Sequence, residues 1–94
     1  MTRIILPGGR TFKALWAADL PGTERWCAAL TADCGFAEAA AGFEGADVIV
    51  TENAETGRCV HEGYTRLLSL RRTKEGLVIM LGRQKEGEAS AFHS

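Results

Sequence analysis

The sequence contains no hydrophobic run long enough to cross a membrane. None of its stretches approaches the ~20 apolar residues that a bilayer span requires. The N-terminal apolar run of residues 4–6 is too short for a secretory signal before Pro7 interrupts it. The three cysteines are an odd number and cannot all pair within one chain, as they would in a disulfide scaffold. We therefore expect a cytoplasmic protein whose thiols are reduced.

Motifs for phosphate binding and catalysis are also missing. The pair Gly8-Gly9 lacks the further glycines, the lysine and the following helix of a phosphate-binding loop. A nucleophile such as Cys59 needs a base that a third group orients, and His61 on the same strand does not provide this arrangement. We expect neither an enzyme nor a cofactor.

A zinc site is the one metal centre that the composition allows. Cys59 and His61 would share a strand face, and Cys27 and Cys34 would share a helix face, so these four residues could form a Cys3His site. No Cys-x2-Cys pair is present. Buried cysteine is a common core residue, so the sequence favours Cys27 and Cys34 as core residues and predicts no metal.

The length of 94 residues suits one hydrophobic core. We expect a single α+β domain over residues 1–85, followed by a flexible polar tail over residues 86–94. An N-terminal β-hairpin is predicted by two β-prone runs, residues 3–6 and 11–16, around the turn Pro7–Arg10. Alternation along the second run would place Phe12, Ala14 and Trp16 toward the core.

One main amphipathic helix is predicted over residues 23–34. Trp26, Cys27, Leu30 and Cys34 form an apolar stripe at helical spacing, and Gly35 is suited to end the helix. This helix would pack on one face of the sheet. Residues 36–41 are alanine-rich and predict a second, short helical segment that ends at Gly42.

A four-stranded antiparallel meander is predicted over residues 47–84. Two β-rich arms flank the turn at Asn53–Gly57, and two more flank the turn at Lys74–Gly76. Leu68, Leu70, Ile79 and Leu81 would face the helix.

Residues 46–54, followed by His61-Glu62-Gly63, resemble the ATP-contacting helix of the anti-sigma kinase and histidine-kinase ATPase family. The resemblance implies one helix across residues 47–62 that binds nucleotide. Thr56 stands where that family has its metal-binding asparagine, and Gly57 would interrupt the helix. Val48, Ile49 and Val50 prefer strands, which favours the hairpin over a degenerate ATPase.

The net charge of −1 hides an asymmetry along the chain. Residues 1–56 carry four basic and eight acidic side chains, whereas residues 57–85 carry seven basic and two acidic ones. The basic half could bind an acidic protein surface or nucleic acid. The candidate partner-binding residues are Arg58, Arg66, Arg71, Arg72, Lys74, Arg83 and Tyr64.

Our leading hypothesis is a small non-catalytic binding or regulatory module that acts through protein–protein contact. One short helix cannot cover both faces of the predicted sheet, so a sheet face or edge would bind a target protein or a second copy in a homodimer. The plan of hairpin, helix and meander is similar in outline to many phage-encoded inhibitors of host defence, anti-CRISPR proteins among them. The alternative is a nucleic-acid-binding domain, in which arginines contact phosphates and Tyr64 or His61 stacks on a base.

Overall fold

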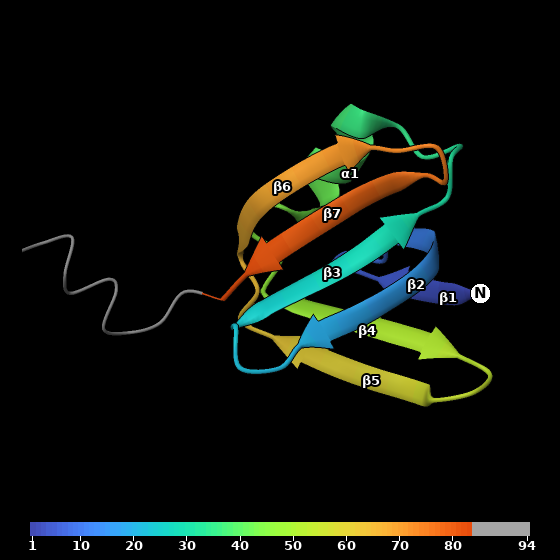
Figure 1. The fold of residues 1–94 in the computed structure, drawn as a ribbon. Coiled ribbons are helices and arrows are strands. Elements are labelled where there is room, and N and C mark those ends of the chain that lie inside the picture. Colours follow the sequence, from blue (N-terminus) through green and yellow to red (C-terminus); the bar gives the residue numbers. More distant parts are fainter. Residues whose placement is uncertain (84–94) are drawn as a thin grey trace, which may run out of the picture.

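The structure is a computed structural model that describes residues 1–83. It contains one helix and seven strands in a single antiparallel sheet (Figure 1). The elements are β1 (Thr2–Ile5), β2 (Thr11–Leu20), β3 (Arg25–Leu30), α1 (Phe36–Phe43), β4 (Val48–Asn53), β5 (Gly57–Glu62), β6 (Arg66–Arg72) and β7 (Leu77–Gly82). The expected α+β class is confirmed, with more strands than the sequence predicts. The tail expected over residues 86–94 lies outside the described residues.

The N-terminal hairpin is confirmed, but its second strand is longer than expected. β1 pairs antiparallel with β2, and β2 continues to Leu20. The register of β2 against β3 shifts between Ala14 and Trp16, which marks a β-bulge. One extra residue reverses the alternation of faces. Phe12 and Ala14 therefore face the core as predicted, whereas Trp16 turns to the opposite face and is 43% exposed.

The prediction of a helix over residues 23–34 is wrong, because this segment contains strand β3. A turn connects β2 to β3 and contains two residues with positive φ, Gly22 at 78° and Glu24 at 56°. β3 then pairs with β2 on one side and β7 on the other. This central strand is apolar on both faces, so it lacks the alternation that distinguishes a strand from a helix in sequence.

The short helix predicted over residues 36–41 is confirmed as α1, which extends through Gly42 to Phe43. Gly42 lies within the helix and leaves room for Phe12, since a Cβ at this position would come 3.0 Å from Cε2 of Phe12. The helix therefore packs closely on β2. Its last residue, Phe43, is fully buried, with ring centroids 5.1 Å from Phe12 and 6.0 Å from Trp26.

The two hairpins predicted in the second half are present, but they do not form a meander. β4 pairs with β5, and β6 pairs with β7. The sheet order is β5-β4-β1-β2-β3-β7-β6, so β5 and β6 form its two edges. The N-terminal strands β1, β2 and β3 lie between the two hairpins. Gly57, at φ 75°, is the first residue of β5 and directly follows the turn from β4. The prediction of an ATPase-like helix across residues 47–62 is therefore wrong.

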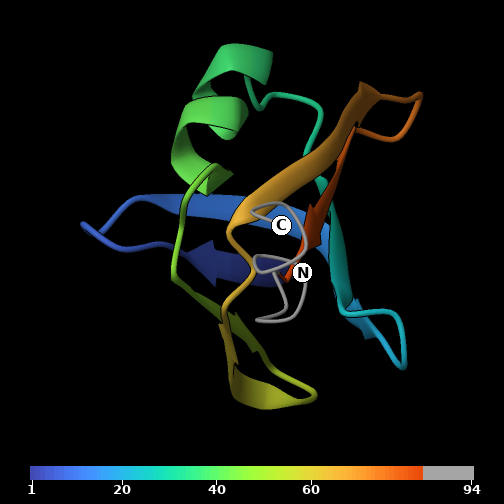
Figure 2. The ribbon, with the colours of Figure 1, turned by 90° about the vertical axis from the view of Figure 1, so that its left-hand side faces the viewer.

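The sheet curls around the core, and α1 lies beside its open side near β6 (Figure 2). The prediction that both Leu68 and Leu70 face the core is wrong for Leu68, because β6 has a bulge between Leu67 and Ser69. Leu67 and Leu70 pack against the core, whereas Leu68 faces outward and is 40% exposed. The largest fully buried side chains are those of Trp26, Phe43, Ile4, Leu30, Ile49, Leu77, Ile79 and Leu81. Within residues 1–83, no helix has the length and apolar character needed to cross a membrane.

Candidate functional site

The convex face of the sheet over β2, β3, β7 and β6 exposes large apolar side chains. Register aligns Trp16, Ala29 and Val78 in one row across the strands, and Ala18, Cys27 and Met80 in the next. In a third row Leu20 lies opposite Arg25, which lies opposite Gly82. We call the larger apolar residues of this face the outer patch: Trp16, Leu20, Leu68, Val78 and Met80. Trp16, Leu20 and Leu68 are 43%, 36% and 40% exposed.

The two bulges create the outer patch. Without the bulge in β2, Trp16 would continue the inward alternation of Phe12 and Ala14. Likewise, the bulge in β6 places Leu68 on the convex face instead of the core face. The side chain of Leu68 then lies over Gly82, where a Cβ would come 2.9 Å from its Cδ1 atom. Sequence reasoning missed this arrangement, although the adjacent large residues Leu15 and Trp16 break simple alternation.

Arginines lie along two sides of the outer patch. Register places Arg25 of β3 and Arg71 of β6 on the convex face, together with Arg66, which lies opposite Gly82. Between them lies Cys27, which is buried although it faces outward. Burial raises the pKa of Cys27, so its thiol remains protonated at neutral pH and is a poor nucleophile. The face therefore offers an apolar centre with a basic rim and no reactive group.

The other candidate partner-binding residues are dispersed. Arg58 lies on β5 at the opposite edge of the sheet and pairs with Glu52 at 3.2 Å. Arg72 donates to the carbonyl oxygens of Ala32 and Cys34, and Lys74 is exposed in the turn between β6 and β7. Arg83 lies over the ring of Tyr64, 4.5 Å from its centroid, and Tyr64 is only 5% exposed.

The four residues of the suggested zinc site do not come together. Cys27 faces outward on β3, and Cys34 lies in the loop before α1. Cys59 and His61 share the concave side of β5, opposite Thr51 and Ile49 of β4. Among residues 1–83, no three histidine, cysteine, aspartate or glutamate side chains are grouped so that they could hold a metal ion.

A polar cluster closes one end of the curled sheet. Asp19 Oδ2 lies 3.1 Å from Nδ1 of His61, and Nε2 of His61 lies 3.1 Å from Oγ1 of Thr51. The Tyr64 hydroxyl donates to Asp19 Oδ1 at 2.9 Å. The order carboxylate, imidazole, hydroxyl occurs in nucleophilic triads. Here Thr51 is only 8% exposed, so its hydroxyl is out of reach of a substrate, and the cluster ties β2 to β4 and β5.

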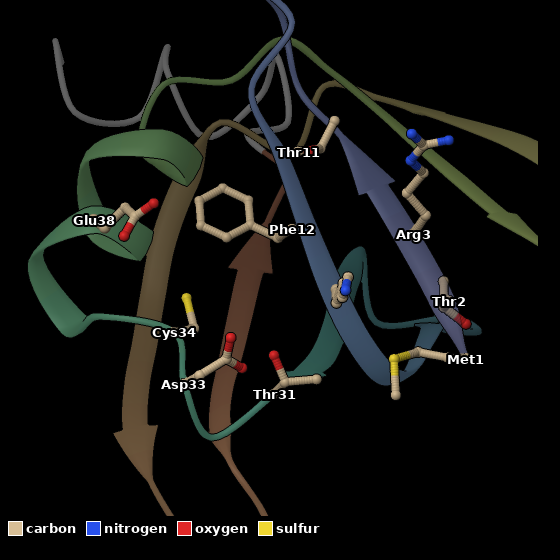
Figure 3. Close-up of a pocket in the computed structure, with 10 residues that line it drawn as sticks. Met1, Thr2, Arg3, Thr11, Phe12, Thr31, Asp33, Cys34 and Glu38 are labelled. Atoms are coloured by element: carbon tan, nitrogen blue, oxygen red, sulfur yellow. The ribbon is translucent and has the colours of Figure 1, made fainter.

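A cavity of about 590 Å³ opens at the other end of the sheet. Figure 3 shows Phe12, Asp33, Cys34 and Glu38 around it. A hydrogen bond from Thr31 lowers the pKa of Asp33. Burial raises the pKa of Cys34, and the negative charges of Glu38 and Asp33 raise it further. The thiol is thus protonated at neutral pH, and the cavity presents no activated nucleophile.

Comparison with family models, with characterised proteins and with solved structures finds no match for this chain.

Proposed function

We propose that this protein is a small non-catalytic binding module that contacts a target protein through the outer patch. The observation that carries the proposal is that Trp16, Leu20 and Leu68, each more than a third exposed, share one face of the sheet with Val78 and Met80. Exposed apolar side chains that adjoin one another and are rimmed by polar residues are typical of interaction surfaces. Tryptophan and arginine are also the residues most enriched among those that dominate binding energy.

The basic rim specifies the chemistry of the partner. Arg25, Arg66 and Arg71 would meet acidic side chains around an apolar centre on the target, which steers encounter and fixes orientation. The likeness to phage-encoded inhibitors rested on a plan of hairpin, helix and meander, and the segment expected to form that helix contains β3. The proposal therefore specifies an acidic-rimmed protein surface as the target and leaves the class of partner open.

The test compares two variants of the full chain as affinity baits. Trp16→Ser with Leu20→Ser removes two large side chains from the outer patch. Phe36→Ser removes an aromatic side chain that is even more exposed, at 52%, from the start of α1. We expect a partner that the unmodified chain and Phe36→Ser retain and the patch variant loses, with the same difference when the purified partner is titrated. Equal binding of that partner by all three chains would contradict the proposal.

A nucleic-acid-binding platform is the second candidate. An exposed aromatic ring on a sheet face beside arginines is the arrangement that binds single strands by stacking and phosphate contact, and Trp16 with Arg25 and Arg71 fits it. Tyr64, expected to stack on a base, is instead buried beneath Arg83. Titration with a random single-stranded oligonucleotide at two salt concentrations tests this candidate. Binding that weakens steeply with salt would support it, and no binding at low salt would remove it.

A further inference from the structure

Strand β5 forms an open edge of the sheet. It is the first strand in the sheet order, and among the described residues it pairs only with β4. Figure 1 shows β5 as the lowest strand, with no other labelled element on its outer side. Five of its six residues are exposed, and Val60 is 56% exposed. An exposed edge strand presents unpaired backbone groups to which another strand can add.

The β5 edge has charged residues, Arg58 and Glu62, but lacks most of the other features that usually protect such strands. Its register with β4 runs without a bulge from Val48↔Glu62 to Asn53↔Gly57, and it contains neither proline nor lysine. The opposite edge, β6, is interrupted by the bulge at Leu68 and is contacted by α1. Bulges, charges and covering elements are the common means of blocking edge-to-edge pairing. Within residues 1–83, β5 is therefore the edge with regular pairing and no covering helix, and Arg83 contacts it at Glu62.

The outward-facing backbone groups of β5 belong to Arg58, Val60 and Glu62. The amide of Gly63 donates to the carbonyl of Asp47, so these two residues form a hydrogen-bonded pair. Hydrogen-bonded and non-hydrogen-bonded pairs alternate along an antiparallel ladder. Residues 59 and 61 thus direct their backbone groups to β4, and residues 58, 60 and 62 direct theirs to the open side. The Glu62 carbonyl already accepts a bond from Nε of Arg83 at 3.0 Å.

We propose that β5 pairs antiparallel with β5 of a second copy of this chain, about a two-fold axis at Val60. In this register Val60 lies opposite the partner's Val60, and Arg58 lies opposite the partner's Glu62. The three residues with outward backbone groups then meet the same three residues of the partner. The proposal concerns an edge of the sheet and does not rest on binding through the outer patch.

Charge complementarity selects this register. Arg58 and Glu62 lie on the same face of β5, two residues either side of Val60, so the two-fold arrangement forms two Arg–Glu pairs. Opposite charges placed directly across antiparallel strands stabilise the pairing. A shift of two residues in either direction places Val60 opposite a charged residue and loses both ion pairs. Arg58 would bridge Glu52 of its own chain, 3.2 Å away, and the partner's Glu62.

Sedimentation velocity of the full chain across a concentration range measures this association. We expect a reversible monomer–dimer equilibrium. Arg58→Glu and Glu62→Arg should each weaken the dimer by about tenfold or more, because each creates two like-charge contacts. The double variant should recover at least part of the affinity, because the two cross-strand ion pairs are restored with exchanged signs. Unfolding of each variant by denaturant checks that the loss is not a loss of fold.

Cysteine cross-linking tests the register. In a Cys59→Ser background, Val60→Cys should oxidise to a disulfide-linked dimer, because hydrogen-bonded antiparallel pairs have Cα atoms about 5.5 Å apart, within disulfide range. Glu62→Cys alone is the matched control and should not cross-link, whereas a mixture of Arg58→Cys and Glu62→Cys chains should.

Three results would overturn the proposal. A chain that stays monomeric at every concentration rules out the dimer. Dimerisation that Trp16→Ser abolishes and Arg58→Glu leaves unchanged would place the contact on the outer patch. Efficient cross-linking by Glu62→Cys alone, without cross-linking by Val60→Cys, would contradict the register. Failure of the partner capture under Proposed function would leave these measurements unaffected.

Discussion

The indole of Trp26 and the imidazole of His61 lie with their ring centroids 6.0 Å apart. They belong to β3 and β5, which are separated in the sheet by β2, β1 and β4. The contact is therefore made across the concave side and requires the sheet to curl. Asp19 and Thr51 hold the two nitrogens of the same imidazole. Together these contacts keep the edge strand β5 above the core.

Tyr64 should ionise at a higher pH in the folded protein than in the unfolded one. Burial raises the pKa of Tyr64, and the hydrogen bond to Asp19 and its negative charge raise it further. A raised pKa means that folding favours the protonated phenol. The resulting stability is complete below the unfolded tyrosine pKa of about 10 and is lost as the pH rises through the higher folded pKa.

Ultraviolet absorbance of the phenolate reports this ionisation without overlap, because Tyr64 is the only tyrosine. The folded protein should give a midpoint above that of the protein in denaturant. Asp19→Asn should move the folded midpoint downward, since it removes the nearby negative charge. Identical midpoints for the folded and denatured protein would show that Tyr64 is not held as the structure describes.

Phe43→Ala should lower the free energy of unfolding by about 3–5 kcal/mol, as large-to-small changes of aromatic core residues do. Phe43 is fully buried and packs against Phe12 and Trp26, so the truncation leaves a cavity between α1 and the sheet. Phe36→Ala on the same helix is the control, because Phe36 is 52% exposed and its loss should cost less than about 1 kcal/mol. Urea unfolding measures both, and equal losses would contradict the packing of α1.

Gly76→Ala should destabilise the protein by about 2 kcal/mol or more, because overpacking forces the backbone to move. A Cβ at Gly76 would overlap the carbonyl oxygen of Leu30, which belongs to the neighbouring strand. Gly35→Ala is the matched control. Its φ of −76° suits any residue, and the nearest contact of its Cβ is 3.7 Å, so its cost should stay below about 1 kcal/mol. Thermal unfolding of the two variants should differ clearly, and a Gly76→Ala protein of unchanged stability would refute the close approach.

Arg83→Ala should lower the free energy of unfolding by about 1–2 kcal/mol. Its guanidinium bonds Glu24 at 3.2 Å and the Glu62 carbonyl at 3.0 Å, and it covers the Tyr64 ring. The side chain is 41% exposed, so solvent screening limits the contribution of its ion pair. Arg83→Lys should recover only part of the loss, because an ammonium group cannot hold both acceptors in the same planar geometry. Arg71→Ala is the control and should change stability by less than about 0.5 kcal/mol in the same denaturation experiment.

Local chemistry determined several elements from the sequence alone. Pro7 and Gly8 mark the first turn, Asn53 and Gly57 mark the turn between β4 and β5, and the alanine-rich segment after Gly35 forms α1. These signals act over a few residues, so they can be identified without knowing the rest of the chain. The hairpins β4–β5 and β6–β7 follow from the same local rules.

Only the tertiary structure decided the identity of β3, the order of the strands and the location of the outer patch. β3 lies centrally between β2 and β7 and buries residues of both faces, and its run Ala28-Ala29-Leu30 consists of good helix formers, so the segment has no strand-like alternation. The single-residue bulges in β2 and β6 reverse the faces of Trp16 and Leu68. Each bulge is set by the register of two paired strands, β2 with β3 and β6 with β7. The side chains of the proposed binding surface are therefore placed by cross-strand pairing, which the alternation along a single strand does not reveal.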